Sequence, residues 1–148
     1  MNINEILKWF KKAVPEPTIE KACTQIGCGY EETAERLGAL HESYSNCNYI
    51  KNLANRYKNK DPFYMGVVSG MCEQQKLELL DSMCDEIVTR IGEAYMLGFD
   101  IEGALDEVNR SNWSKFENGS PVFDENGKIK KGASYFKPDL SRFIDTSK

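Results

Sequence analysis

Apolar residues recur every three or four positions along most of the first two thirds of the chain, the spacing that places them on one face of a helix. A first helix is predicted over about residues 4–14, and Pro15 and Pro17 end it. Thr18 is a suitable N-cap for a second helical stretch, which runs to about residue 44. The N-terminal third therefore predicts two helices joined by a proline-containing turn.

The middle of the chain is less regular. A helix is predicted around residues 50–57, and Asp61-Pro62 indicates a break after it. A long helix then covers about residues 78–96 and ends near Gly98, a residue type that often terminates helices.

A further short helix, opened by Asp100, leads into a tail of different character. After Arg110 the chain is rich in glycine, serine and asparagine, and Asn126-Gly127 between two apolar stretches predicts a tight β-hairpin. Together these patterns predict an all-α fold. It is a helical bundle of about four to six helices, with a short C-terminal β-hairpin and a loop-rich basic tail over residues 110–148.

Length and charge narrow the class of protein. A chain of 148 residues, of which 41% are apolar, is expected to form a single domain. Its net charge of −4 argues against nucleic acid as a partner, and no apolar run reaches the roughly 20 residues that span a membrane. The charge is uneven, because residues 110–137 carry +3 and the remainder carries −7. The sequence thus pairs an acidic helical body with a basic tail.

Five cysteines and one histidine limit the chemistry further. The number of cysteines is odd and no two are spaced as C-x-x-C, so we expect reduced thiols in a cytoplasmic compartment. A zinc site would require closer spacing or more histidines. His41, the single histidine, gives poor support to a serine or cysteine nucleophile.

Three acids share one face of the predicted helix at residues 78–96. At about 100° per residue, Glu78, Asp81 and Asp85 fall within about 60° of one another. The apolar residues of the same helix form an arc that we expect to be buried, and Asp81 lies at the edge of this arc. Because charged side chains rarely border a buried face without a partner, this helix is a candidate for half of a metal site.

A second acidic cluster lies in the helical stretch that follows Thr18. Glu31, Glu32 and Glu35 lie on neighbouring parts of one helix face. Carboxylates on two facing helices repel each other unless a cation lies between them, and Mg²⁺ prefers oxygen ligands. The alternative for either cluster alone is an ordinary solvated helix face, but the two clusters together favour the metal.

The basic tail contains groups that bind phosphate. Asn109, Asn112 and Lys115 follow one another at intervals of three and would share a face if the last helix continues through them. Lysine suits phosphate because it is a flexible point charge. A phosphate ligand would join these residues to carboxylate-bound Mg²⁺. A solvated loop with scattered lysines is the alternative.

These stretches resemble the all-α nucleoside triphosphate pyrophosphohydrolases, the MazG-like and phosphoribosyl-ATP pyrophosphohydrolase-like group, and especially its small phage and bacterial versions. Glu31-Glu32-Thr33-Ala34-Glu35 matches the E-E-x-x-E motif of the family, and Glu78-Leu79-Leu80-Asp81, with Asp85, matches its E-x-x-D helix. The tail from Glu107 to Leu140 is the more specific part, because its order and spacing match over about 30 residues.

The resemblance implies hydrolysis of a nucleoside triphosphate between the α and β phosphates, with Mg²⁺ or Mn²⁺ as the cofactor. It implies that Glu31 orients or deprotonates the attacking water. The implied metal ligands are Glu32, Glu35, Asp81 and Asp85, with Glu78 as a further ligand. The implied substrate-binding residues are Asn109, Asn112, Lys115, Lys128, Lys131 and Tyr135. A homodimer or homotetramer in the cytoplasm of a bacterium or a phage-infected host is also implied.

Functions from other classes remain open from the sequence. If the second acidic motif is aligned on Asp85, Ser82 stands where the family has an acid. A relative that has lost catalysis, and binds a nucleotide or a host protein as a sequestering or inhibitory module, would show such an irregularity. A helical scaffold without a ligand is a third interpretation, and nucleic-acid binding through the tail is the least favoured.

Overall fold

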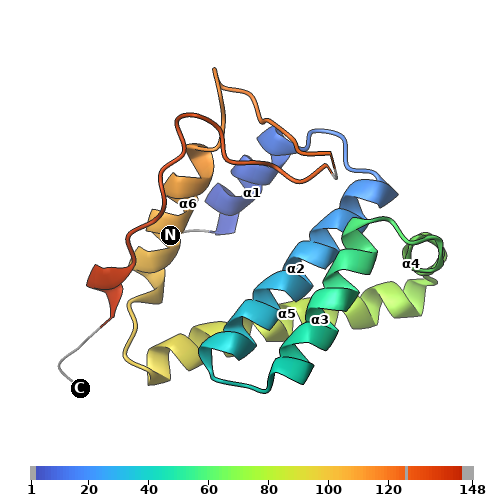
Figure 1. Cartoon of the computed structure of the whole chain (residues 1–148), viewed down its shortest axis with the longest axis horizontal. Coiled ribbons are helices and arrows are strands. Elements are labelled where there is room, and N and C mark those ends of the chain that lie inside the picture. Colours follow the sequence, from blue (N-terminus) through green and yellow to red (C-terminus); the bar gives the residue numbers. More distant parts are fainter. Residues whose placement is uncertain (1–2, 126, 145–148) are drawn as a thin grey trace. The chain divides into compact units, whose positions relative to one another are not determined.

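The computed structural model describes residues 3–125 and 127–144, which form six α-helices and one short 3-10 helix. These residues form no extended strand, and the all-α prediction is confirmed (Figure 1). The helices belong to two compact units. The central unit comprises Glu16–Met71 and Phe123–Lys128, and the terminal unit comprises the described parts of Met1–Pro15, Cys72–Val122 and Ile129–Lys148.

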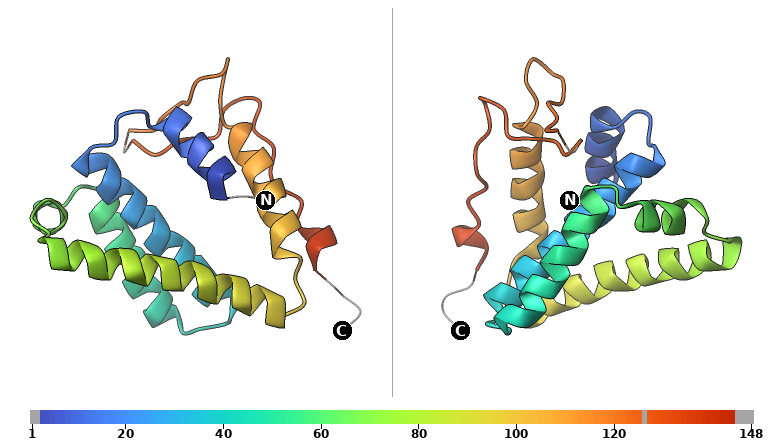
Figure 2. Two further views of the ribbon diagram at one scale, coloured as in Figure 1. Left: turned by 180° about the vertical axis from the view of Figure 1, so that it is seen from behind. Right: turned by 45° about the vertical axis from the view of Figure 1, so that its right-hand side comes forward.

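The central unit is built on two antiparallel helices, α2 (Ile19–Ala39) and α3 (Tyr44–Lys58), which lie side by side (Figures 1 and 2). The shorter α4 (Pro62–Ser69) follows. Thr18 caps α2 by accepting a hydrogen bond from the backbone N–H of Lys21 at 3.3 Å, as the sequence predicts. The predicted second helical stretch is shorter than expected, because α2 ends at Ala39 and a turn separates it from α3.

Small residues allow α2 and α3 to approach closely. Cys23 and Ala34 of α2 and Ala54 of α3 are almost completely buried between them and their neighbours. A Cβ atom on Gly27 would lie 2.6 Å from the carbonyl oxygen of Ala54, so only glycine fits this point of the helix pair. The rings of Tyr57 on α3 and Tyr64 on α4 also pack together, with their centroids 4.3 Å apart and their planes tilted by 32°.

The core of the terminal unit lies between α1 (Ile3–Ala13) and the residues that follow α6 (Ile101–Trp113). Trp9 and Phe116 are buried there with their rings stacked, and their centroids are 5.8 Å apart. The amphipathic pattern predicted for residues 4–14 therefore forms a helix whose apolar face packs on its own unit.

The tail of the terminal unit runs back along α6. The hydroxyl of Ser111 donates to the carbonyl of Phe136 at 2.8 Å, and the backbone N–H of Asp139 donates to Oε1 of Glu107 at 3.0 Å. The short 3-10 helix Ser141–Phe143 lies near the start of α6, where its last carbonyl accepts from the N–H of Asp100 at 2.9 Å. These bonds hold a segment with little regular structure in a defined position.

The predicted C-terminal β-hairpin does not form a pair of strands among the described residues. Asn126, half of its predicted turn, lies outside them. The chain does reverse direction here, because the N–H of Asp124 donates to the carbonyl of Lys128 at 2.8 Å. The side chain of Asp124 also accepts from the N–H of Lys128 at 2.9 Å. A second backbone bond, from the N–H of Lys130 to the carbonyl of Val122 at 2.9 Å, continues the pairing, so the two segments pair over a few residues without forming strands.

The long helix α5 (Glu73–Met96) begins five residues before the predicted start and ends where predicted. The N–H of Cys72 donates to Oε1 of Gln75 at 3.0 Å at its N-terminus. At its C-terminus Gly98 takes a left-handed conformation with φ of 76°, which glycine adopts at little cost.

The expectation that the apolar arc of α5 is buried is wrong for the described structure. Within the terminal unit α5 meets only α6, where Ala94 is buried. Along the rest of the arc, Leu80 is 58% exposed, Val88 is 68% exposed and Tyr95 is 80% exposed. The periodicity of the sequence correctly identifies the apolar face but does not identify what covers it.

Candidate functional site

The most developed polar cluster in the central unit surrounds Glu31 on α2. Nζ of Lys58, in the last turn of α3, donates to Oε1 of Glu31 at 2.9 Å. Nζ of Lys128 donates to Oε2 of the same carboxylate at 2.7 Å. Each oxygen of Glu31 therefore has its own ammonium partner, and one of the two comes from the basic tail.

This cluster is partly buried, and its charges stabilise one another. The side chain of Glu31 is 29% exposed and that of Lys58 is 15% exposed. Hydrogen bonds from Lys128 and Lys58 lower the pKa of Glu31 below its ordinary value of 4.5, so the carboxylate is ionised at neutral pH. Burial lowers the pKa of Lys128, but the bond to Glu31 and the nearby negative groups outweigh it, and the net shift is upward.

The other two acids of the first motif lie next to this cluster. Glu32 and Glu35 are both exposed on α2. The negative charge of Glu32 contributes to the raised pKa of Lys128, which places the two groups within electrostatic reach. One helix face therefore presents three carboxylates, with the two ammonium groups gathered at Glu31.

The acids of the second motif lie on α5 in the terminal unit. Glu78, Asp81 and Asp85 are all exposed and follow one another along the helix beside its apolar face. Oε1 of Glu78 accepts a hydrogen bond from Nε2 of Gln74 at 2.9 Å. Among residues 3–125 and 127–144, no three or more side chains of His, Cys, Asp or Glu lie close enough together to hold a metal ion.

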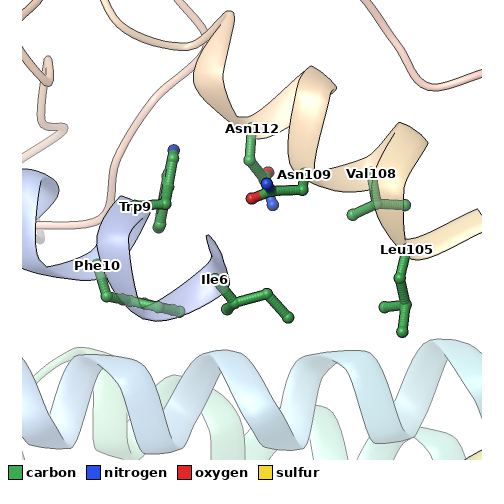
Figure 3. A pocket seen from close by; sticks show the side chains of 7 residues that line it. All are labelled: Ile6, Trp9, Phe10, Leu105, Val108, Asn109 and Asn112. Carbon is green, nitrogen blue, oxygen red and sulfur yellow. The ribbon is translucent and has the colours of Figure 1, made fainter. Parts of the chain in front are cut away.

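Three predicted substrate-binding residues meet at the C-terminal half of α6. Asn109 and Asn112 line one side of a small pocket against Trp9, and the other lining residues are apolar (Figure 3). Nζ of Lys115 donates to Oδ1 of Asn112 at 2.7 Å and lies 6.0 Å from the centre of the Trp9 ring. The prediction that these three share a face is supported for Asn112 and Lys115 by this direct contact.

The pocket beside Asn109 and Asn112 is apolar and small. Its remaining lining residues are Ile6, Phe10, Leu105 and Val108. The indole N–H of Trp9 is buried without a hydrogen-bond partner among the described residues. At about 60 Å³ the cavity is well below the roughly 300 Å³ of typical ligand sites, so as it stands it does not enclose a nucleotide.

The remaining predicted substrate-binding residues fall into separate groups. Nζ of Lys131 lies 4.9 Å from the centre of the Tyr135 ring, a cation–π distance. Lys128 belongs to the Glu31 cluster of the central unit. The six predicted residues therefore form three small groups: one on α6, one along the tail and one at Glu31.

Two residues with several polar contacts were not predicted as site residues from the sequence. Lys58 stands 27 positions from Glu31 with no motif to connect them, and only the antiparallel pairing of α2 and α3 brings them together. Glu107, 4% exposed, accepts two hydrogen bonds from the guanidinium of Arg110 and one from the N–H of Asp139. The bonds from Arg110 and Asp139 lower the pKa of Glu107. An acid and a base at i and i+3 were the available signal for this anchor.

Comparison with known proteins adds no assignment, because no family model, no curated protein and no solved structure matches the chain. Over the part of the chain that the structure describes, no helix is both long and apolar enough to cross a membrane.

Proposed function

We propose that this protein hydrolyses a nucleoside triphosphate between its α and β phosphates, with Mg²⁺ as the cofactor. The observation that carries the proposal is the cluster at Glu31. The tail lysine Lys128 contacts a carboxylate of the E-E-x-x-E motif 97 positions earlier in the chain. An acidic helix and a basic tail segment thus meet at one point, as a site for a metal-bound phosphate requires.

The cluster contains the groups that phosphate chemistry uses. Lys58 and Lys128 are point charges on flexible stems, and each can exchange its bond to Glu31 for a phosphate oxygen. When they do so, Glu31 is released as an ionised carboxylate that can accept a proton from water. In the ligand-free protein the same two lysines hold Glu31 in position.

The carboxylates of the two acidic helices suit Mg²⁺, because every donor in the set is a hard oxygen. The ion would be held by Glu32 and Glu35 of α2 and by Asp81 and Asp85 of α5, with Glu78 as a further ligand. When bound, Mg²⁺ neutralises phosphate charge and lowers the pKa of a coordinated water. Mn²⁺, which takes similar ligands, is expected to substitute.

The reaction assigns a role to each group. Water attacks the α-phosphorus and transfers its proton to Glu31, the bond from the α-phosphorus to the bridging oxygen breaks, and pyrophosphate leaves. Lys58 and Lys128 stabilise the charge that develops on the phosphate oxygens. Asn109, Asn112, Lys115, Lys131 and Tyr135 are assigned to binding the rest of the nucleotide.

The setting of the proposed enzyme follows the family that the sequence resembles. We propose a homodimer or homotetramer in the cytoplasm of a bacterium or a phage-infected host. All five cysteines are free in the structure, and Cys23 and Cys47 are buried, which agrees with a reducing compartment.

The test is a pyrophosphate-release assay of the full chain against the four ribonucleoside and four deoxyribonucleoside triphosphates, with Mg²⁺ and with excess chelator. We expect release from at least one nucleotide, and only with Mg²⁺. Equal rates with and without chelator would contradict the metal-dependent mechanism.

A second candidate function is a nucleotide-binding module without catalysis. The observation in its favour is that the acids of α5 lie on an exposed helix, and that no metal-binding group is formed among the described residues. Its signature in the same experiment is a nucleotide-dependent rise in melting temperature with no release of pyrophosphate from any nucleotide.

A further inference from the structure

A row of exposed apolar residues lies along α5 of the terminal unit. This helix is long and straight (Figure 2). Leu77 is 56% exposed, Ile87 is 49% exposed and Ile91 is 46% exposed, and Leu80 and Val88 are more exposed still. Monomeric proteins seldom present an apolar row of this length to water. The row therefore indicates a surface that another helix covers.

The apolar row has the seven-residue period of a coiled coil. Leu77, Cys84 and Ile91 occupy equivalent positions seven residues apart, which we label a, and Leu80 and Ile87 occupy the d positions between them. All five lie within about 80° of one another at 100° per residue, so they form one seam. The buried Ala94 falls at the next d position, where α6 covers the helix and ends the seam.

The two edges of this seam carry complementary side chains. One edge, the g positions of the repeat, contains Lys76, Met83 and Arg90. The other edge, the e positions, contains Asp81, Val88 and Tyr95. One edge is therefore basic and the other begins with an acid, and each has an apolar residue at its centre.

This arrangement selects an orientation for self-association. In a parallel pair each g residue faces the e residue five positions later in the other helix. In the metal-free protein Lys76 then faces Asp81 of the second copy, and Met83 faces Val88 of the second copy. Arg90, whose guanidinium binds Glu93 of its own helix at 2.6 Å, lies opposite Tyr95 of the second copy. An antiparallel pair places g edges against g edges, so Lys76 would approach Arg90 and the like charges would repel.

We propose that α5 pairs with α5 of a second copy, in parallel and in register, through the seam from Leu77 to Ile91. With roughly half of each seam and edge side chain exposed, the pair buries on the order of 1,000 Å², near the lower limit for a specific interface. The occupant is thus a second copy of this chain, bound mainly by apolar contact and oriented by its charged edges.

The first test measures the mass of the full chain by sedimentation equilibrium, without Mg²⁺ or nucleotide, so that the result is independent of the proposed catalysis. We expect a dimer for the parent. Ile87→Asp places a charge at the centre of the seam and is expected to weaken association at least tenfold. Leu79→Asp, on the outer face of the same helix, is the matched control and is expected to remain dimeric.

A second test measures disulfide cross-linking and does not depend on whether Ile87→Asp folds. In a chain with Cys72→Ser and Cys84→Ser, a single Leu77→Cys substitution is oxidised with diamide. Parallel, in-register helices place the two thiols opposite each other, within the distance that a disulfide spans, and a covalent dimer is expected. Ile91→Cys in the same background should also form one, whereas Leu79→Cys should not.

Three outcomes would overturn the proposal. A parent chain that is monomeric at high concentration while Cys84 resists a thiol reagent would show that the rest of the same chain covers the seam. A monomeric parent with a reactive Cys84 would show that nothing covers it. A dimer in which Leu77→Cys cross-links only to Ile91→Cys would show an antiparallel pair.

Discussion

The two acidic helices of this protein carry similar motifs in different surroundings. On α2, Glu31 lies in a packed helix pair and binds one lysine with each oxygen. On α5, Asp81 and Asp85 lie on a helix that meets only α6 within its own unit. Packing therefore fixes the position of a carboxylate on the first helix, whereas the carboxylates of the second have no comparable neighbours among the described residues of the terminal unit.

The same contrast appears in the apolar residues. Small residues such as Gly27 and Ala54 allow α2 and α3 to come together, and their seam is buried. The large apolar residues of α5 are about half exposed. The contact between α2 and α3 is formed within one unit, and α5 presents a surface that a second helix can cover.

The largest expected effect is on catalysis. Glu35→Gln and Asp81→Asn each remove one proposed metal ligand, and each is expected to reduce Mg²⁺-dependent pyrophosphate release at least about a hundredfold with an unchanged melting curve. Glu86→Gln, at another exposed acid of α5, is the control and should keep the parental rate. If Asp81→Asn is fully active while Glu35→Gln is not, the packed helix alone supplies the metal site.

The next largest effect concerns the stability of the α2–α3 pair. Gly27→Ala places a methyl group 2.6 Å from the carbonyl oxygen of Ala54, and the two helices must separate to admit it. We expect the free energy of unfolding to fall by about 1–3 kcal/mol, measured by urea denaturation. Gly29→Ala, in the same helix but facing open space, should instead raise stability by a few tenths to about 1 kcal/mol. Equal effects of the two substitutions would contradict the close approach at Gly27.

A smaller effect is expected from the protonation of Glu31. Because its pKa is lower in the folded protein than its ordinary value of 4.5, the ion pairs contribute stability above pH 4.5, and this contribution is lost as the pH falls through the folded pKa. The loss should be about 1 kcal/mol, since the pairs are only partly buried. Glu31→Gln should remove this part of the pH dependence in urea denaturation, and Glu32→Gln should retain it.

The smallest expected effect comes from the tail lysine. Lys128 is 42% exposed, so water weakens its pair with Glu31, and Lys128→Gln should cost only about 0.5 kcal/mol of unfolding free energy. Lys130→Gln is the matched control, two positions away, and should leave stability unchanged. A loss for Lys130→Gln as large as for Lys128→Gln would show that the tail acts through its total charge.

Local patterns were sufficient to predict most of the helices. The cap at Thr18, the break at Asp61-Pro62 and the glycine end of α5 were all predicted from the sequence, because each depends on residues a few positions apart. The hairpin prediction was wrong for the described residues, because Asn-Gly between apolar residues favours a tight turn but does not supply partners for extended strands.

Longer-range relations could not be predicted in the same way. The contact of Lys58 with Glu31 depends on how two helices cross, which no local pattern encodes. The exposure of Val88 and Tyr95 depends on what covers α5, and an apolar face looks the same in sequence whether its partner is inside or outside the chain. The sequence was therefore sufficient to identify candidate site residues, but it did not predict which of them come together in the folded chain.

The position of bond cleavage tests the proposed function most directly. The protein is incubated in oxygen-18-labelled water with Mg²⁺ and the best nucleotide of the panel, and the products are examined by mass spectrometry. Water attack at the α-phosphorus predicts one labelled oxygen in the nucleoside monophosphate and none in the pyrophosphate. Label in the pyrophosphate, products consisting of a nucleoside diphosphate and orthophosphate, or no turnover of any nucleotide would contradict the proposed function.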